Sequence, residues 1–169
     1  MQKFVSIFFL LISIHHYTLA QAECGCCTQN HLQFDFWLGE WNVYDTDGKK
    51  IGENNIVKME AGCLIQENWQ GKSGSTGSSF NFYDPADSTW NQIWVDNQGN
   101  NLQLKGKATA SSMVLQSELS QSPEGKWQYN RITWTIGTDG SIIQLWEILD
   151  RNLEVEKVAF KGIYKRKPD

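Results

Sequence analysis

The stretch FDFWLGEWNVY, residues 34–44, can be interpreted as one face of a helix or as the opening strand of a β-sheet protein. The choice between these two interpretations determines the predicted fold class. Trp37, Gly39 and Trp41 recur at a spacing of two residues, which is the period of a β-strand and places all three on one face. A glycine between two indoles leaves room for a close backbone approach. We therefore predict that residues 37–41 lie on the first strand.

The same period continues through the rest of the chain. Short alternating or aromatic-rich segments are separated by turn sequences such as DTDG, NQGN and SPEG. Only TQNHLQF, residues 28–34, favours a helical turn, with Thr28 as its N-cap. The predicted strands are residues 41–44, 51–60, 64–70, 78–83, 90–96, 101–108, 112–119, 127–136, 142–149 and 153–165.

The regular alternation of short strands and turns predicts an all-β fold: a single up-and-down antiparallel β-barrel of about ten strands with a short N-terminal helical turn. We expect the last strand to return beside residues 37–41 and close the barrel.

The first 22 residues have the pattern of a secretory signal peptide. Lys3 precedes an apolar run at residues 4–14, and Ala20 and Ala22 offer cleavage sites. The run is shorter than the roughly 20 apolar residues of a spanning helix, so we predict no membrane span. The expected organisation is a signal peptide at 1–22, a Cys-rich segment at 23–35 and a β-barrel domain at 36–169. The expected location is outside the cytoplasm, either periplasmic or secreted.

The charge pattern argues against a nucleic-acid partner. The chain has 15 Lys and Arg against 19 Asp and Glu, and loss of Lys3 with the signal peptide would bring the net charge near −5. No basic run precedes YKRK at residues 164–167. Polyanion-binding proteins carry basic patches, so we expect neither nucleic acid nor an anionic membrane surface as a partner. Oligomeric state is left open by the sequence.

Four cysteines leave alternatives. Cys24, Cys26 and Cys27 open the predicted mature chain, and Cys63 lies in a turn between the second and third predicted strands. In an exported protein disulfides are the expected state, with Cys63 joined to one of the first three. The alternatives are a zinc or copper(I) site formed by the first three thiols with His31, and a Cys24–Cys27 redox pair. We predict disulfides and no metal site.

The order of motifs supports a family resemblance. Gly-x-Trp on the first strand, followed by an up-and-down run of strands, resembles the calycin barrels: lipocalins, fatty-acid-binding proteins and nitrobindins. In those families the tryptophan closes one end of the barrel under a basic residue of the last strand, which implies a role here for Lys165 or Arg166. The Phe-Trp-Leu-Gly-x-Trp motif, with GCLIQENW, SFNFYDPADSTWNQIWVD, NRITWT, DGSIIQLWE and FKGIYKR, resembles a bacterial family of secreted proteins of unassigned function. That resemblance implies a fold and an exported location, and no catalytic residues.

Catalytic patterns are sparse. Once the signal peptide is removed, His31 is the remaining histidine, and no Gly-x-Ser-x-Gly, His-Glu-x-x-His or phosphate-loop motif occurs. A nitrobindin-like haem site would need a histidine from a late strand. We therefore predict no catalytic residues and no cofactor.

Tryptophan distribution is the strongest functional signal. The chain has 8 tryptophans, and several share a strand face with an amide or charged residue. Aromatic area combined with a few polar groups is typical of a barrel interior that holds an amphipathic molecule. The predicted ligand-binding residues are Trp69, Tyr83, Gln92, Trp94, Arg131, Gln144 and Trp146.

Arg131 in particular predicts a ligand with an acidic or strongly polar end. The alternative is an internal ion pair between Arg131 and Glu67 or Glu147. The predicted function is an exported binder of a small amphipathic or hydrophobic molecule. The alternatives are an isomerase, cyclase or hydrolase acting in the same cavity, for which a buried Glu67 or Glu147 would be the acid or base, and a structural barrel without a cavity.

Overall fold

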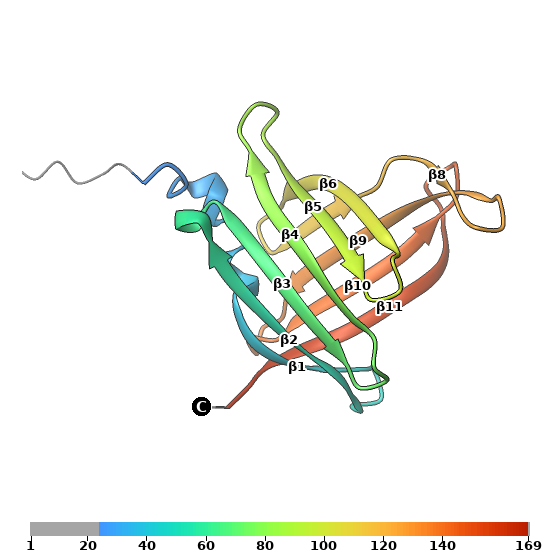
Figure 1. Cartoon of the computed structure of the whole chain (residues 1–169), viewed down its shortest axis with the longest axis horizontal. Helices are drawn as coiled ribbons and strands as arrows, with labels where there is room; N and C mark the ends of the chain where they lie inside the picture. The colour runs from blue at the N-terminus through green and yellow to red at the C-terminus, as the bar shows by residue number, and fades with distance from the viewer. Residues whose placement is uncertain (1–23, 169) are drawn as a thin grey trace, which may run out of the picture.

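The computed structural model describes residues 24–168, so the predicted signal peptide lies outside the described residues. It consists of short 3-10 turns and one antiparallel sheet (Figure 1). The 3-10 turns are η1 (Gln29–Leu32), η2 (Asp35–Trp37) and η3 (Glu60–Gly62). The strands are β1 (Gly39–Tyr44), β2 (Lys50–Met59), β3 (Leu64–Gly71), β4 (Thr76–Asp84), β5 (Thr89–Asp96), β6 (Asn101–Ala108), β7 (Ser112–Gln116), β8 (Ser120–Gln121), β9 (Trp127–Ile136), β10 (Ile142–Leu149) and β11 (Val155–Arg166).

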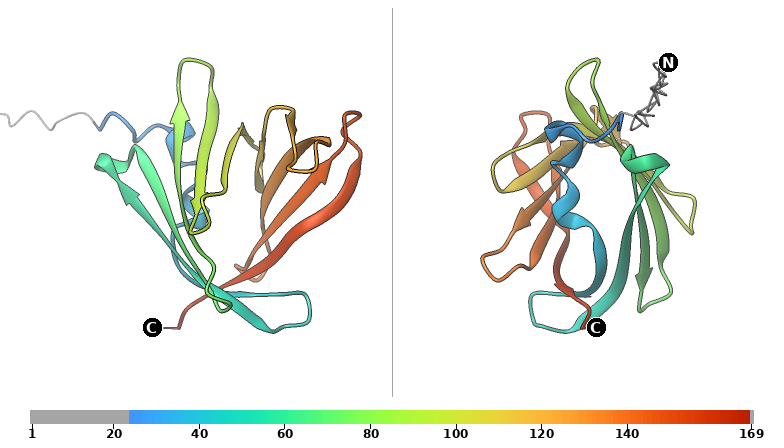
Figure 2. Two further views of the ribbon diagram at one scale, coloured as in Figure 1. Left: turned by 45° about the vertical axis from the view of Figure 1, so that its right-hand side comes forward. Right: turned by 90° about the vertical axis from the view of Figure 1, so that its left-hand side faces the viewer.

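Ten of these strands close into the predicted up-and-down barrel. Neighbours in sequence are neighbours in the sheet from β1 to β7, then β7 pairs with β9, and β9 with β10 and β10 with β11. The ring is completed by β11 against β1, where Trp41 pairs with Arg166. The short strand β8 pairs only with the start of β9, in a hairpin outside the ring. Figure 2 shows the barrel as a cup with the N-terminal segment running along one wall and inward.

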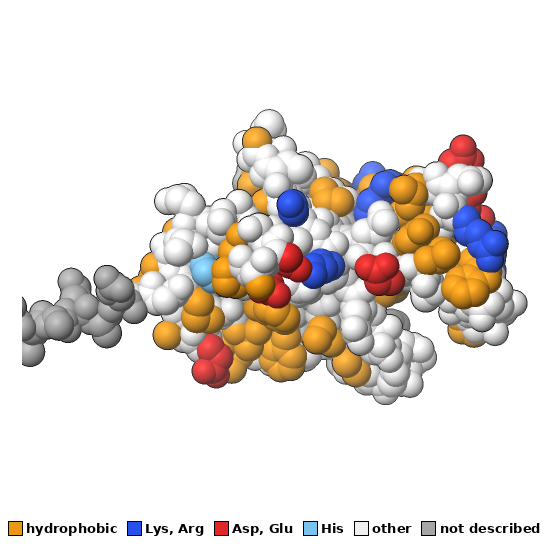
Figure 3. Space-filling model, turned by 90° about the horizontal axis from the view of Figure 1, so that it is seen from above, with side chains coloured by type: hydrophobic (Ala, Val, Ile, Leu, Met, Phe, Trp, Pro, Cys, Tyr) orange, Lys and Arg blue, Asp and Glu red, His pale blue; other side chains and the backbone are white. Residues whose placement is uncertain are grey.

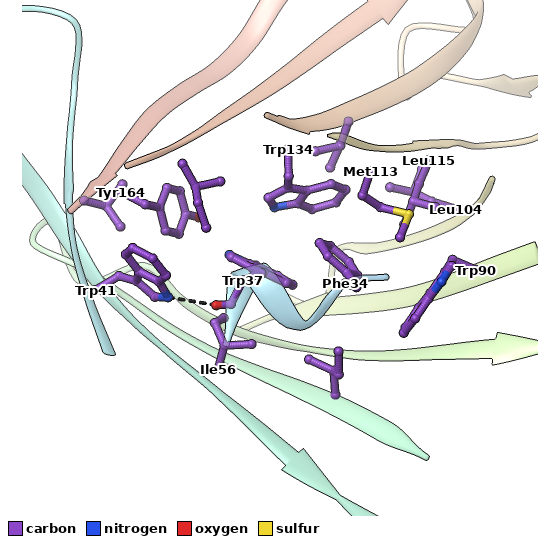
Figure 4. Packing of buried hydrophobic residues seen from close by; sticks show 14 of the residues in the cluster. Phe34, Trp37, Trp41, Ile56, Trp90, Leu104, Met113, Leu115, Trp134 and Tyr164 are labelled. Carbon is purple, nitrogen blue, oxygen red and sulfur yellow. Dashed lines mark hydrogen bonds between the residues drawn. The ribbon is translucent and has the colours of Figure 1, made fainter. Parts of the chain in front are cut away.

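The segment before β1 closes one end of the barrel. The predicted helical turn is present as η1 after Thr28, whose hydroxyl lies 2.7 Å from His31 Nδ1. Trp37 is not on the first strand as predicted; it ends η2, and β1 begins at Gly39. Phe34 and Trp37 are fully buried, stacked at 4.9 Å between ring centroids, and Figure 4 shows them inside the barrel among inward-facing side chains. Spacing alone did not separate a turn from a strand here, because burial of both indoles fits either.

Gly39 allows the chain to pass from η2 into β1. Its φ of 120° is strained for any residue with a side chain, and a Cβ there would lie 2.4 Å from Nη1 of Arg166. Arg166 reaches back over this position, donates a hydrogen bond to the Leu38 carbonyl oxygen at 3.1 Å, and lies 4.4 Å from the Trp41 ring centroid. Of the two basic residues considered above, Arg166 therefore covers Trp41, and Lys165 contacts Tyr44 instead.

Two disulfides are present, and one of them joins the N-terminal segment to the barrel. Cys26 is joined to Cys63, which follows η3, and Cys24 is joined to Cys27. The predicted bond between Cys63 and the cysteine-rich segment is therefore confirmed. All four thiols are consumed in these bonds, so they do not form the alternative metal site.

Candidate ligand-binding site

Inward-facing residues change character along each strand. At the end closed by η2 they form an apolar core that includes Ile56, Ile65 and Trp134. Two residues further along several strands the inward positions are polar and still buried. The members of this polar belt are Asn54, Glu67, Ser79, Asn81, Gln92, Gln144 and Tyr164, the last by its hydroxyl. The next inward positions are tryptophans on β3, β5 and β10 and glycines on β2, β4 and β11, and there the barrel is hollow.

Glu67 is the centre of the polar belt. It lies on β3, is 4 % exposed, and accepts two hydrogen bonds of 2.7 Å: from Asn54 Nδ2 on β2 to Oε1, and from Ser79 Oγ on β4 to Oε2. Alternation along three adjacent strands brings these side chains to one level. Both partners are neutral, so the carboxylate is solvated by dipoles and not by a positive charge.

The belt extends from Glu67 in both directions around the wall. On one side Asn54 also donates to the Tyr164 hydroxyl at 3.3 Å, and that hydroxyl donates to Gln144 Oε1. On the other side Asn81 donates to Ser79 Oγ at 2.9 Å. Gln92 then donates to Asn81 Oδ1 at 2.7 Å. A connected network of this kind holds each amide in one orientation and separates the apolar core from the space above it.

Burial changes the acidity of both ionisable members of the belt. Loss of solvation raises the pKa of the Glu67 carboxyl to about 7, and the hydrogen bonds from Ser79 and Asn54 offset only part of that rise. Burial, reinforced by the nearby charge of Glu67, raises the pKa of the Tyr164 hydroxyl well above its usual value. Glu67 therefore titrates near neutral pH while Tyr164 stays protonated.

A cavity of about 460 Å³ lies above the polar belt. Its floor includes Glu67 and Gln144, and its walls carry three indoles and a phenyl ring, from Trp69, Trp94, Trp146 and Phe160. This volume falls within the range of about 300–1,000 Å³ typical of small-molecule sites, and aromatic walls over a few polar groups are their usual lining.

Glycines under the rings widen the cavity. A Cβ at Gly52 would lie 2.4 Å from Trp69 Cη2, and a Cβ at Gly77 would lie 2.2 Å from Trp94 Cζ2. Each indole therefore lies against bare backbone of the neighbouring strand. Phe160 covers Gly162 of its own strand, where a Cβ would lie 2.7 Å from Phe160 Cε1. Because no side chain lifts these rings from the wall, the space between opposite walls stays open.

The hydrogen-bonded wall around the cavity is interrupted beside β6. That strand pairs with β5 from Asn101 to Gly106, but with β7 only from Lys105 to Ala108. The start of β6 therefore has no partner on its other side. Asn101 is exposed there and lines the cavity together with Leu102 and, from β9, Asn130.

Five of the seven residues predicted to bind a ligand line this cavity: Trp69, Gln92, Trp94, Gln144 and Trp146. Trp146 is further held by a hydrogen bond of 3.0 Å from its indole nitrogen to Asn130 Oδ1. Tyr83 does not line it. Its ring is buried at the closed end against His31 and Trp90, and its hydroxyl accepts a hydrogen bond from Asn30 at 2.9 Å.

Arg131 is also outside the cavity, which corrects the prediction that it meets a ligand. Its neighbours Asn130 and Ile132 line the cavity, so alternation places the arginine on the outer face of β9. There its Nε and Nη2 donate to Glu147 Oε2 at 3.1 and 3.0 Å, across the pair formed by β9 and β10. The ion-pair alternative is thus the observed one, although the pair is on the outside wall and its arginine is 31 % exposed.

Several site residues were missing from the prediction. Asn54, Ser79, Phe160 and Tyr164 belong to the belt or the cavity wall, and each has inward neighbours at a spacing of two. On β2 the sequence Gly52-Glu-Asn54-Asn-Ile56 contains this signal, with a glycine, an amide and an aliphatic residue on one face. The prediction rested on strand faces that carry aromatic residues, and this face of β2 carries none.

Charged side chains of both signs occur together on the face seen in Figure 3. Seen from above in Figure 3, blue and red side chains are scattered and form no continuous basic patch on that face. Within residues 24–168 no three His, Cys, Asp or Glu side chains are grouped so that they could hold a metal ion. No helix among those residues is long and apolar enough to cross a membrane.

Comparison with known proteins gave no identification. Neither a scan against protein-family models nor a search of curated proteins found a match to this chain.

Proposed function

We propose that this protein is an exported small-molecule-binding protein that holds an amphipathic ligand inside its β-barrel. The single observation that carries the proposal is the hollow above the polar belt, because its three indoles offer apolar area and its floor offers hydrogen-bonding groups. Two disulfides support the location, since such bonds persist in oxidising compartments.

Binding of a neutral amphipathic fluorophore, N-phenyl-1-naphthylamine, tests the proposal. We expect saturable binding of one molecule per chain, with enhanced emission from the apolar site. Leu102→Trp adds a ring at the cavity wall and should weaken this binding strongly. Tyr83→Phe, which alters the closed end of the barrel, should leave it unchanged. Absence of saturable binding, or equal binding by Leu102→Trp, would contradict the proposal.

One observation favours catalysis in the same cavity. A buried carboxyl with a pKa of about 7 is suited to proton transfer at neutral pH. Among the described residues that line the cavity there is no Lys, Arg, His or Cys to act with it. Native mass spectrometry on protein from its own host separates the two functions. In a carrier, any molecule retained by Glu67→Gln has the same mass as the one retained by wild type, whereas an enzyme retains product in one and substrate in the other.

A further inference from the structure

The cavity is acidic. Two carboxylates line it, Glu67 at the floor and Asp96 at the rim, and no described lining residue is basic. Hydrogen bonds in the turn after β5, first from Asn100, hold the pKa of Asp96 below its usual value. The potential inside the cavity is therefore negative once Glu67 ionises. Confinement by low-dielectric walls strengthens this field.

Glu67 has no positive partner among residues 24–168. Its bonds come from the neutral groups Asn54 and Ser79, and none of the ion pairs among the described residues includes it. Ionising a carboxyl that is 4 % exposed without a counter-ion is costly. A cation that entered the cavity would remove this cost, whereas an anion would increase it.

The walls above Glu67 also suit a cation. Indole rings attract ammonium groups through the negative potential of their faces, and tryptophan is the strongest side chain in this respect. Trp69, Trp94 and Trp146 surround the space over the floor, and the glycines under two of them keep their rings against the wall. The same rings give an apolar ligand body its contact area.

We propose that the ligand of this cavity is an organic cation, an amphipathic amine whose ammonium group pairs with Glu67 and whose apolar body lies among Trp69, Trp94 and Trp146. This inference rests on the proposed function and names its ligand class. It replaces the acidic ligand expected from Arg131, because that arginine pairs with Glu147 on the outer wall.

Three probes with one apolar body and different head groups test the charge preference: octylamine, octanol and octanoate. Their affinities are measured by calorimetry near pH 8, where Glu67 is ionised. One charge-assisted contact strengthens binding about 10- to 100-fold, so octylamine should exceed octanol by about that factor, and octanoate should bind most weakly. Preference for octanol or octanoate would overturn the inference while leaving the proposed function intact. Failure of all three probes and of the neutral fluorophore would overturn both.

Variants then locate the preference. Glu67→Gln removes the charge with little change in shape and should bring octylamine and octanol to equal affinity. Glu60→Gln removes an exposed carboxylate at the closed end and is the matched control; it should keep the wild-type preference. If Glu67→Gln still prefers octylamine, Glu67 is not the counter-ion and the inference is wrong.

A titration of the wild-type protein gives an independent answer that does not depend on the folding of a variant. Between about pH 6 and 8 the affinity for octylamine should rise as Glu67 ionises, while the affinity for octanol should not. Tyr164 from β11 and Asp96 from β5 are the other titratable groups facing this space, and the directions of their pKa shifts keep both in one state over this range. An octylamine affinity independent of pH would overturn the inference.

Discussion

At the scale of the residue, Glu67 makes the stability of the barrel depend on pH. Its carboxyl has a pKa of about 7 in the folded protein and an ordinary value of 4.5 when unfolded. The folded state therefore binds more protons between these values, and the free energy of unfolding falls as pH rises through this window. Glu67 lowers the free energy of unfolding by about 3 kcal/mol in total, a loss that is complete above pH 7 and absent below pH 4.5.

We expect Glu67→Gln to remove this decline. Thermal melts of wild type and variant are compared from about pH 5 to 8, and the difference between them should grow in favour of the variant as pH rises. Carboxylates with lowered pKa, such as Glu53 and Asp87, change the free energy of unfolding only in more acidic solution. Their contribution is the same in wild type and variant, so it cancels in the difference. A pH-independent difference would show that Glu67 does not titrate in this range.

Arg131 shows where residue-level prediction from sequence fails. A period of two says that Arg131 and Tyr129 share one face and Asn130 and Ile132 the other, but not which face is inside. The indoles and Arg131 were together predicted to form a ligand site. In the structure Asn130 points inward, whereas the charged Arg131 points outward. Which face of a strand lies inside a closed barrel depends on its register with the neighbouring strands. That register cannot be determined from one sequence alone.

For the same reason we expect a small effect from Arg131→Gln. Its pair with Glu147 is partly exposed, and such pairs contribute about 1 kcal/mol or less. Ligand binding should not change. Lys126→Gln removes the cation of a more exposed pair with Glu156 and should cost even less. Urea denaturation measures both, and a loss of several kcal/mol for Arg131→Gln would mean that Glu147 is effectively buried.

At the scale of the element, the strands and the turns between them were predictable, but the 3-10 turn that bears Trp37 was not. The ten predicted strands match the ten of the barrel because alternation and Gly-, Asp- and Asn-rich turns recur along the whole chain. Trp37 was assigned to a strand because its spacing to Gly39 and Trp41 fits the strand period. What sets it in a turn is the packing of Phe34 and Trp37 inside the barrel, a tertiary contact beyond local spacing.

The contact between β4 and β5 sets the width of the cavity. Gly77→Ala adds a methyl group 2.2 Å from Trp94 Cζ2, which must move the indole off the wall. A ligand that pushed the ring back against the wall would restore this clash, which costs about 1–3 kcal/mol, so affinity for the amphipathic fluorophore should fall roughly 10-fold. Ser78→Ala alters the next residue, whose side chain points to the opposite face, and should keep wild-type affinity. Equal affinity of both variants would show that the ring already has room to move.

At the scale of the whole molecule, the fold was predictable but the bottom of its cavity was not. A meander with an aromatic first strand predicted that the last strand returns beside the first, and in the structure β11 pairs with β1. The polar belt requires side chains from β2, β3, β4, β5, β10 and β11 to meet at one level. That level is set by the stagger of strands around the barrel, and no single segment of sequence contains it.

The Cys26–Cys63 disulfide joins the segment that plugs one end of the barrel to the turn between β2 and β3, which leads to the last prediction. Cys26–Cys63 spans 37 residues, including β1 and β2, whereas Cys24–Cys27 spans 3. In the chain-entropy model a loop of the first length contributes about 4 kcal/mol, and a very short loop contributes much less. Replacing Cys26 and Cys63 together by serine should therefore lower the free energy of unfolding by about 4 kcal/mol. The matched replacement of Cys24 and Cys27 should lower it by less than half as much. Chemical denaturation of both double variants measures these losses in the free energy of unfolding. Equal losses would mean that the bond to Cys63 does not hold the segment bearing Phe34 and Trp37 inside the barrel. Packing of those two rings alone would then keep this end closed.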